Sequence, residues 1–434
     1  MKTFYLFLFI VFMFIVSCGN KVTSPSETIG NITYYNPAYS ETKEFPFWQF
    51  DRLGNYNETR AKFSKIVESE HTIVYLQDGY NITREKVISF FTEFENNYKK
   101  EIEIYGNHSD LDGNGKIIFL MAELNINIRP EDSVLMGYFA PNDITEGKDG
   151  VRGEFLYIDV VYINETTIGF IMHEFQHLIN YNVNVLEGKK EPDIWFNEML
   201  SESTSHIFSK YLTDERLAIF NIIPIYSFYS WYLRYTDGQH ILNDNKVIFS
   251  YASASVFSKW LDMNTGGNYN IYKELANSSP KLSSEERLVS TVKKLNSNLG
   301  NDMNDMLINW LKDINDRKVP NASLIVLESS SGNLFPLVPK AAILYETVNI
   351  PSIADSQKIK TKDLGNGYSI ILNTLVNAEA GLVDRKDVVE VRLPQLSALN
   401  SSSAYQKYDL DLLPKRHYFI DRVITEKDIK YINK

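Results

Sequence analysis

The spacing of apolar positions divides the chain into three stretches with different periods. In the first stretch, four short runs rich in β-branched and aromatic residues predict strands at 71–76, 116–121, 137–139 and 154–159. Residues 83–105 instead carry apolar side chains at every third or fourth position, which predicts a helix that ends at Gly106. Strands that alternate with a helix indicate an α/β half over residues 46–165.

The apolar period is helical from residue 166 to residue 320, where several amphipathic runs follow one another. Beyond residue 320 the pattern changes to short alternating or apolar stretches separated by Gly, Asn and Ser, which predicts a β-rich accessory module over residues 321–434. The fold class expected from the three stretches is α+β, with an α/β half, a helical half and this module.

The N-terminus has the pattern of an export signal. An apolar run from Phe4 to Val16 is too short to cross a bilayer comfortably, so residues 1–17 are predicted to be a signal peptide. The following Cys18 completes a sequence that resembles the bacterial lipobox, which implies acylation of this cysteine and a membrane-anchored lipoprotein facing the periplasm or the cell exterior. Residues 18–45 are rich in Asn, Ser, Thr and Pro and are expected to form a solvated tether without a fold.

Composition narrows the class of partners. The 434 residues include 55 acidic and 44 basic side chains, which gives a net charge of −11. No long basic run is present, so the chain lacks the charge pattern that nucleic-acid binding needs, and nucleic acid is excluded as a partner. A chain of this length with one cysteine can bury a large core without disulfides.

A sequence with metal-binding chemistry lies at residues 173–177, which read HEFQH inside an apolar helical run. His173 and His177 are four residues apart and therefore lie on one helix face, where they can bind the same metal ion. Burying two imidazoles and the carboxylate of Glu174 among apolar residues without a metal would be costly. The pattern therefore predicts a metal site.

A third ligand is expected in the next amphipathic run. Glu198 follows His177 by 21 residues, and two His with one Glu form a catalytic zinc set that leaves a fourth position for water. Glu202 is one turn beyond Glu198, where it could accept the free ring N–H of His173 and fix its tautomer. Glu174 is then the expected general base, which takes a proton from the attacking water and passes it to the departing amine.

These residues carry a family resemblance. HExxH followed by NEMLSE resembles the gluzincin metallopeptidases, and HEFQHLINY with WFNEMLSE is most similar to the hyicolysin family of bacterial secreted peptidases. The likeness extends more weakly from Asp110 to Gly266, about a third of the chain. It implies a two-lobed zincin-like peptidase domain over residues 46–320, with the ligands and the base assigned above. Met199 departs from the family pattern, which has Gly after the ligand glutamate.

Peptide hydrolysis by this chemistry also needs a donor for the oxyanion, which gluzincins supply from a Tyr or His after the third ligand. Tyr251 is the first choice because it opens a run of small residues, SYASAS, and follows Glu198 by 53 residues. The alternatives are other aromatic and histidine side chains of this half: Tyr226, Tyr229, Tyr232 and His240. His206, one turn after Glu202, is expected to be a satisfied helix-face histidine.

The segment DLDGNG at residues 110–115 resembles the first half of a calcium loop, with oxygen ligands at alternate positions and Gly sixth. The twelfth position is Met121 where a glutamate is required. An Asp-Gly turn that introduces the strand at 116–121 is therefore favoured over a Ca²⁺ site.

The function expected from these residues is zinc-dependent hydrolysis of protein or peptide substrates at a membrane-anchored enzyme. An endopeptidase is favoured over an aminopeptidase, because nothing upstream resembles the G-x-M-E-N segment that binds a free amine in aminopeptidase gluzincins. The alternative is a surface-anchored zinc protein that binds host or matrix proteins, with lost or secondary proteolysis. A metal-uptake lipoprotein would not need Glu174 or Glu202.

Overall fold

The structure is a computed structural model, and it describes residues 25–52, 55–129, 134–145, 152–186, 191–231, 234–236, 241–243, 247–279, 281–327, 334–353, 355–376, 383–392 and 418–419. The predicted signal peptide and Cys18 lie outside the described residues. Among the described residues, no helix combines the length and the apolar character that crossing a membrane requires.

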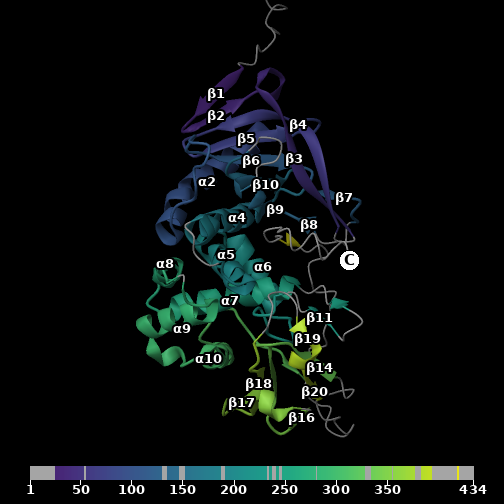
Figure 1. Ribbon diagram of the computed structural model, residues 1–434, viewed down its shortest axis with the longest axis vertical. Helices are drawn as coiled ribbons and strands as arrows, with labels where there is room; N and C mark the ends of the chain where they lie inside the picture. The colour runs from purple at the N-terminus through teal and green to yellow at the C-terminus, as the bar shows by residue number, and fades with distance from the viewer. Residues whose placement is uncertain are drawn as a thin grey trace, which may run out of the picture.

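One mixed sheet forms the N-terminal half of the molecule (Figure 1). Within the described part of the chain its strands follow the order β1-β2-β4-β5-β6-β10-β9, and β3 pairs with β4 and with β7. Their bounds are β1 Ser26–Ile29, β2 Ile32–Tyr35, β3 Thr42–Asp51, β4 Tyr56–Glu68, β5 Thr72–Gln77, β6 Ile117–Ala122, β7 Asn125–Ile126, β9 Gly137–Phe139 and β10 Phe155–Asp159. Strands β5, β6 and β10 are parallel to one another, and β9 is antiparallel to β10 at the end of the order.

The central strands and the helix beside them agree with the sequence prediction. β6 and β10 are almost entirely buried, as expected for continuous apolar runs in parallel strands that are covered on both faces. Helix α2, Arg84–Tyr105, begins after Thr83, whose side chain accepts a hydrogen bond from the backbone N–H of Lys86, and ends at Gly106. Its buried Phe91 and Phe94 pack edge-on against Phe119 of β6.

The prediction of a tether over residues 18–45 was wrong for its described part. Residues 26–35 form the hairpin β1–β2, and β3 runs from Thr42 along the long strand β4. Ile32, Phe45 and Phe47 are buried in this arrangement. The polar composition misled the prediction because β1 is fully exposed and the first three residues of β3 are exposed, which is compatible with antiparallel strands that have a solvated face.

Helices occupy the middle of the molecule, between the first sheet and the C-terminal strands (Figure 1). The α-helices that follow α2 are α3 Asn142–Thr145, α4 Thr167–Tyr181, α5 Ile194–Phe208, α6 Lys210–Phe220, α7 Val247–Asn264, α8 Asn270–Ala276, α9 Ser284–Leu295 and α10 Met303–Asn315. α4 lies beside α2 and β9 on one side and packs on α5 on the other, and α5 packs in turn on α7. This succession agrees with the helical half predicted for residues 166–320.

The C-terminal part contains two small sheets, β13-β15-β18-β17 and β14-β20-β16. The bounds of these and the remaining strands are β8 Val134–Leu135, β11 Arg234–Thr236, β12 Ile241–Asn243, β13 Val326–Leu327, β14 Leu334–Leu337, β15 Ala342–Glu346, β16 Ser352–Ile353, β17 Ile359–Asp363, β18 Tyr368–Asn373, β19 Val383–Asp384, β20 Val389–Arg392 and β21 Tyr418–Phe419. The region is rich in strands, and it is attached to the helical half, because Tyr226 exchanges backbone hydrogen bonds with Ala342 and β19 pairs with β11. Overall the protein combines α and β structure in a manner compatible with an α+β fold.

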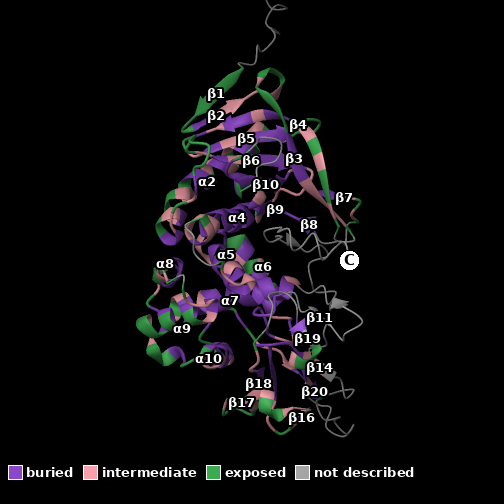
Figure 2. Ribbon diagram, viewed as in Figure 1, coloured by how far each residue is buried: buried purple, intermediate pink, exposed green. Residues whose placement is uncertain are grey.

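Burial is deepest where the sheet meets the helices. Figure 2 shows buried residues concentrated in β5, β6, α4 and α7. In α4 every residue from Thr167 to Asn180 is buried, including its polar side chains. The polar side chains of this helix are therefore placed in the protein interior.

Candidate metal centre

Helix α4 carries both histidines of the HEFQH segment in the interior. The side chains of His173 and His177 are fully buried, and their ring centroids are 4.7 Å apart. The four-residue spacing gives this closeness, since residues i and i+4 of an α-helix lie one above the other. The structure thus places the two imidazoles on one face, as the spacing predicts.

Helix α5 brings the expected third ligand to this face. Oε2 of Glu198 lies 3.3 Å from Nε2 of His173 and 3.5 Å from Nε2 of His177. One ligand atom from each of the three residues lies within 4.8 Å of the other two. Nε2 of both histidines and both carboxylate oxygens of Glu198 have no hydrogen-bond partner in the described part of the chain. Buried polar atoms normally have partners, so this convergence fits a shared metal ion.

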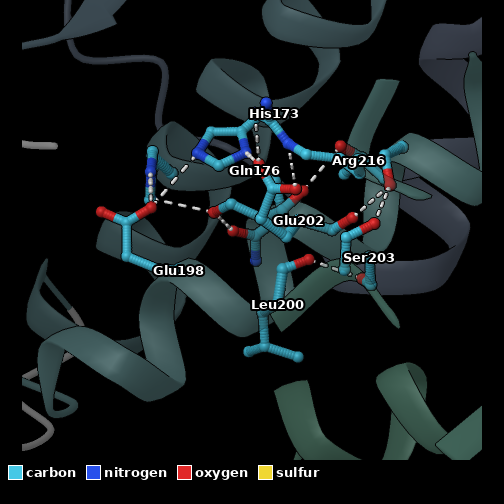
Figure 3. Close-up of polar contacts among 12 residues, drawn as sticks. His173, Gln176, Glu198, Leu200, Glu202, Ser203 and Arg216 are labelled. Carbon is cyan, nitrogen blue, oxygen red and sulfur yellow. Dashed lines mark hydrogen bonds and ion pairs between the residues drawn. The ribbon is translucent and has the colours of Figure 1, made fainter. Parts of the chain in front are cut away.

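The second nitrogen of His173 faces Glu202, as predicted (Figure 3). Nδ1 of the ring lies 3.3 Å from Oε1 of Glu202. A metal ion bound at Nε2 would leave the ring proton on Nδ1, where Glu202 can accept its hydrogen bond.

Glu202 has a further partner that the sequence analysis missed. Arg216 of α6 donates hydrogen bonds from Nε to Oε2 of Glu202 at 2.9 Å and from its terminal nitrogen to Oε1 at 3.0 Å, and both side chains are fully buried. The guanidinium is held over the rings of Phe170 and Tyr251, at 5.7 and 5.2 Å from their centroids. A signal was present, because Arg216 lies on the same helix face as Leu212 and Phe220, where an apolar residue is expected.

His177 is oriented by two side chains of α5 to which the sequence analysis gave no role. Its Nδ1 lies 3.2 Å from Oδ1 of Asn197 and 3.0 Å from Oγ of Ser201. Ser201 in turn donates a hydrogen bond to Gln176. Asn197 cannot accept a hydrogen bond from a ring nitrogen that lacks a proton, so the contact again favours Nδ1–H and a free Nε2. Asn197 and Ser201 were visible in the sequence as part of the NEMLSE segment.

Charges in the cluster compensate one another. Burial alone would raise the pKa of Glu198, but the neighbouring imidazoles of His177 and His173 lower it to about 2. Burial alone would lower the pKa of His173, whereas Glu198 and Glu202 raise it to about 9. The pKa of Glu202 is likewise lowered, because Arg216 and His173 outweigh the effect of its burial. The lowered pKa values favour the negatively charged forms of Glu198 and Glu202 beside their positively charged neighbours.

Glu174 packs beneath the last strand of the sheet order. A Cβ atom at Gly137 of β9 would lie 3.8 Å from Cγ of Glu174 and only 2.6 Å from the backbone oxygen of Tyr157, so this position requires glycine. Burial raises the pKa of Glu174 well above its ordinary value, although the charge of His173 opposes the shift. Neither carboxylate oxygen has a hydrogen-bond partner in the described residues.

Tyr251 of α7 lies at the edge of the cluster. Its ring centroid is 6.0 Å from that of His173 and 4.8 Å from that of Trp231, and the residue is 1% exposed. Of the competing residues, Tyr226 holds the backbone N–H of Ile325 through its hydroxyl at 2.6 Å, which is a structural contact. Tyr251 is therefore near the cluster, and its role as a donor stays a prediction.

The other candidates are placed away from the cluster or are not described. Tyr229 stacks on Trp195 and donates to Glu285 at 3.3 Å. The ring of His206 contacts the hydroxyl of Tyr272 at 3.1 Å, in line with a helix-face histidine that has a partner. Tyr232 and His240 lie outside the described residues. Met199, the departure from the family pattern, is buried in the main apolar core.

The cluster is closed to solvent in this conformation. His173, Glu174, His177, Glu198 and Glu202 are each at most 1% exposed. A cavity of about 650 Å³ lies at the start of α5, and it is lined by acidic and aromatic residues that include Asp193, Trp195, Tyr229, Glu285 and Asp302. None of the three clustered ligands lines this cavity. The clustered side chains therefore have almost no contact with solvent in this structure.

Comparison with known proteins gives one informative match. No protein-family model matches the chain. A curated protein named neutral metalloprotease ShpI, from Staphylococcus hyicus, is 26% identical over 237 residues, which are 51% of this chain and 51% of that protein. The chain thus spans about half the length of this curated relative. The relative is named a metalloprotease, and the present chain brings together His173, His177 and Glu198, a donor set of the kind that binds zinc.

Proposed function

We propose that this protein is a lipid-anchored, extracytoplasmic zinc endopeptidase of the two-lobed zincin type, with the sheet half and the helical half on either side of the metal centre. The observation that carries the proposal is the convergence of three unpartnered, buried ligand atoms from His173, His177 and Glu198, with Glu174 adjacent on α4. Anchoring through Cys18 rests on the lipobox-like sequence alone.

The residues fit a zinc ion by chemistry and by surroundings. Two neutral imidazoles and one carboxylate are a catalytic zinc set, and Glu202 and Asn197 face the ring nitrogens that zinc would leave free. A zinc ion held there supplies a Lewis acid that polarises a peptide carbonyl and makes a water molecule more acidic.

The protein's own side chains then have defined tasks in hydrolysis. The carboxylate of Glu174 takes the proton of the attacking water and delivers it to the departing amine nitrogen. Tyr251 donates its hydroxyl proton as a hydrogen bond to the oxygen on which negative charge develops. Glu202, held by Arg216, keeps His173 in one tautomer throughout.

An extended substrate can be positioned by β9. This strand is the last in the sheet order and passes over Glu174, so an added peptide strand would bring its backbone close to the base. Recognition through backbone hydrogen bonds suits cleavage within a chain, which supports an endopeptidase.

The test compares the full-length protein with Glu174→Gln on a broad peptide library, with zinc content measured in both. We expect about one zinc per molecule in each and a loss of cleavage by about 10²–10⁴-fold in the variant, as for removal of a general base. Glu165→Gln, an exposed carboxylate just before α4, is the matched control and should cleave normally.

Other outcomes contradict the proposal in distinct ways. Zinc without cleavage by either protein would favour the alternative, a surface zinc protein that binds other proteins. Absence of zinc from both would refute the site. Cleavage restricted to N-terminal residues would replace the endopeptidase by an aminopeptidase.

A further inference from the structure

A second cluster of three carboxylates lies at the start of strands β6 and β10. Asp110 and Asp112 lie in the loop between α2 and β6, and Glu154 immediately precedes β10. One carboxylate oxygen from each lies within 4.8 Å of the other two. Like charges at this separation repel one another, and a bound cation would relieve the repulsion.

The protein itself supplies no such cation in the described part of the chain. The nearby Lys116 directs its ammonium group to the backbone oxygen of Ser69 and to Glu68. No ion pair joins a described basic side chain to any of the three carboxylates.

Glu154 distinguishes this cluster from an ordinary acidic surface loop. The residue is 0% exposed, and its Oε1 accepts a hydrogen bond from the backbone N–H of Leu111 at 3.0 Å. Its Oε2 is buried and has no hydrogen-bond partner among the described residues. A buried carboxylate oxygen without a partner is costly, and a bound cation removes that cost.

The loop shares part of its sequence pattern with a calcium loop, and Glu154 offers a carboxylate where that pattern lacks one. Asp110, Asp112 and Asn114 offer oxygens at alternate positions, and Gly115 at the sixth position has φ +67°, which turns the loop back. Met121, at the position where a calcium loop has its closing glutamate, is buried in β6. Glu154 reaches the same loop from the neighbouring parallel strand β10.

We propose that Asp110, Asp112 and Glu154, with Asn114 of the same loop, bind one Ca²⁺ ion. All donors are oxygens, and their irregular arrangement in a partly exposed loop suits Ca²⁺ better than Mg²⁺, which demands a small octahedral site. The ion joins the loop before β6 to the residue before β10. The backbone N–H of Ile118 donates a hydrogen bond to the backbone carbonyl oxygen of Glu154 at 2.8 Å. The ion would therefore add a second link between the starts of β6 and β10.

The test is calorimetric titration of CaCl₂ into the full-length protein after removal of free calcium, together with thermal unfolding. We expect one ion per molecule with a dissociation constant of about 10⁻⁵–10⁻³ M. Saturating Ca²⁺ should raise the Tm by roughly 3–8 °C, because only the folded state holds the site. The same concentration of MgCl₂ should give less than a quarter of that shift.

Two variants separate a built site from diffuse attraction of cations. Asp112→Asn and Glu154→Gln should each weaken Ca²⁺ binding at least tenfold, whereas Glu70→Gln, which removes a neighbouring exposed charge, should bind as the unaltered protein does. In the absence of Ca²⁺, Glu154→Gln should be at least as stable as the unaltered protein, because it relieves repulsion. This readout keeps loss of binding distinct from loss of folding.

The proposal is overturned by three results. These are no saturable binding of Ca²⁺, unchanged binding by Glu154→Gln, or an equal shift of Tm with Mg²⁺. It does not depend on peptidase activity, so zinc content and peptide cleavage do not decide it.

Discussion

Helices α5 and α2 both contain fully buried glutamates, but Glu198 and Glu202 of α5 have oppositely charged neighbours and Glu101 of α2 has no hydrogen-bond partner in the described residues. Glu198 and Glu202 of α5 face two imidazoles and a guanidinium, and the pKa of each carboxyl is lowered although both are fully buried. Glu101 of α2 is also fully buried, but neither of its oxygens has a hydrogen-bond partner in the described residues, and burial raises its pKa well above the ordinary value. The two helices are neighbours, since Tyr105 of α2 shares a hydrogen bond with Ser203 of α5.

The difference shows what burial of a carboxyl group requires. On α5 the charge is kept because partners repay the loss of hydration, and a charged site is available for a metal. At Glu101 nothing in the described residues opposes desolvation, so burial holds the pKa of this carboxyl well above its ordinary value. Depth of burial is therefore a poor guide to function unless the partners of the buried group are known.

The largest effect should come from removing a clustered carboxylate. Glu198→Ala deletes one of the three proposed metal ligands, so zinc content should fall and peptide cleavage should drop by about 10⁴-fold or more. Metal analysis and an assay of the same sample check this. Glu191→Gln changes an exposed glutamate shortly before α5 and should leave both values unaltered. Retention of one zinc by Glu198→Ala would exclude this residue as a ligand.

Replacing Arg216 tests whether its guanidinium group compensates the buried charge of Glu202. Arg216→Met leaves Glu202 buried without its cation, which should lower the free energy of unfolding by about 3–5 kcal/mol in a urea titration. Lys210→Met on the same helix removes an ammonium group that is 82% exposed and should cost at most about 0.5 kcal/mol.

A double variant distinguishes lost compensation from lost packing. Glu202→Gln combined with Arg216→Met removes both charges, so it should recover part of the stability lost by Arg216→Met alone. No recovery would mean that packing of the long side chain, and not its charge, stabilises α6. Zinc affinity should stay about 10–100-fold reduced in the double variant, because His173 loses its carboxylate partner.

A smaller effect is expected at the edge of the cluster. Tyr251→Phe removes the proposed donor to the oxyanion, so kcat should fall by about 10²-fold while KM and zinc content change little. Tyr226→Phe is the control, because its hydroxyl accepts a backbone hydrogen bond away from the cluster and should affect stability alone. An unchanged kcat in Tyr251→Phe would assign the donor role to another group.

The smallest effect concerns the uncompensated acid. The folded state keeps the proton of Glu101 at pH values where the unfolded chain releases it, so stability falls as pH rises above about 4.5 towards the raised pKa. Glu101→Gln removes this loss. The Tm of Glu101→Gln minus that of the unaltered protein should be near zero at pH 4.5 and should grow by about 2 °C by pH 8.

The matched control lies on the same helix. Glu93→Gln replaces an exposed glutamate of α2, so its Tm difference should not vary with pH. A difference for Glu101→Gln that is flat or shrinks as pH rises would show that Glu101 is ionised in the folded protein.

Local patterns in the sequence were sufficient for the metal cluster and the central strands. The spacing of His173 and His177 is a property of one helix. The apolar runs of β6 and β10 predict strands without any knowledge of the rest of the fold. Glu198 could be proposed because the chemistry required a third ligand within the next helix.

Features that depend on distant partners could not be predicted in the same way. Arg216 looks like one charged residue in a polar helix until α5 places Glu202 opposite it. Glu154 reaches the acidic loop only because β10 lies beside β6 in the sheet. The strands of residues 26–51 were missed because β1 and the start of β3 are exposed, so these strands depend on pairing with their neighbours and not on an apolar run.

The short distance along the chain between Cys18 and the first described strands limits how far these strands can lie from an acylated Cys18. The described part of the chain begins at Pro25, seven residues after Cys18, and the carbonyl oxygen of Pro25 accepts a hydrogen bond from the backbone N–H of Asn36. A fully extended segment of that length spans at most about 25 Å. If Cys18 is acylated, this segment keeps the β1–β2 end of the sheet near the bilayer surface. The maximum separation is then smaller than the hydrocarbon thickness of a bilayer, which is about 30 Å. The membrane surface would then restrict the directions from which another protein could approach the β1–β2 end of the sheet.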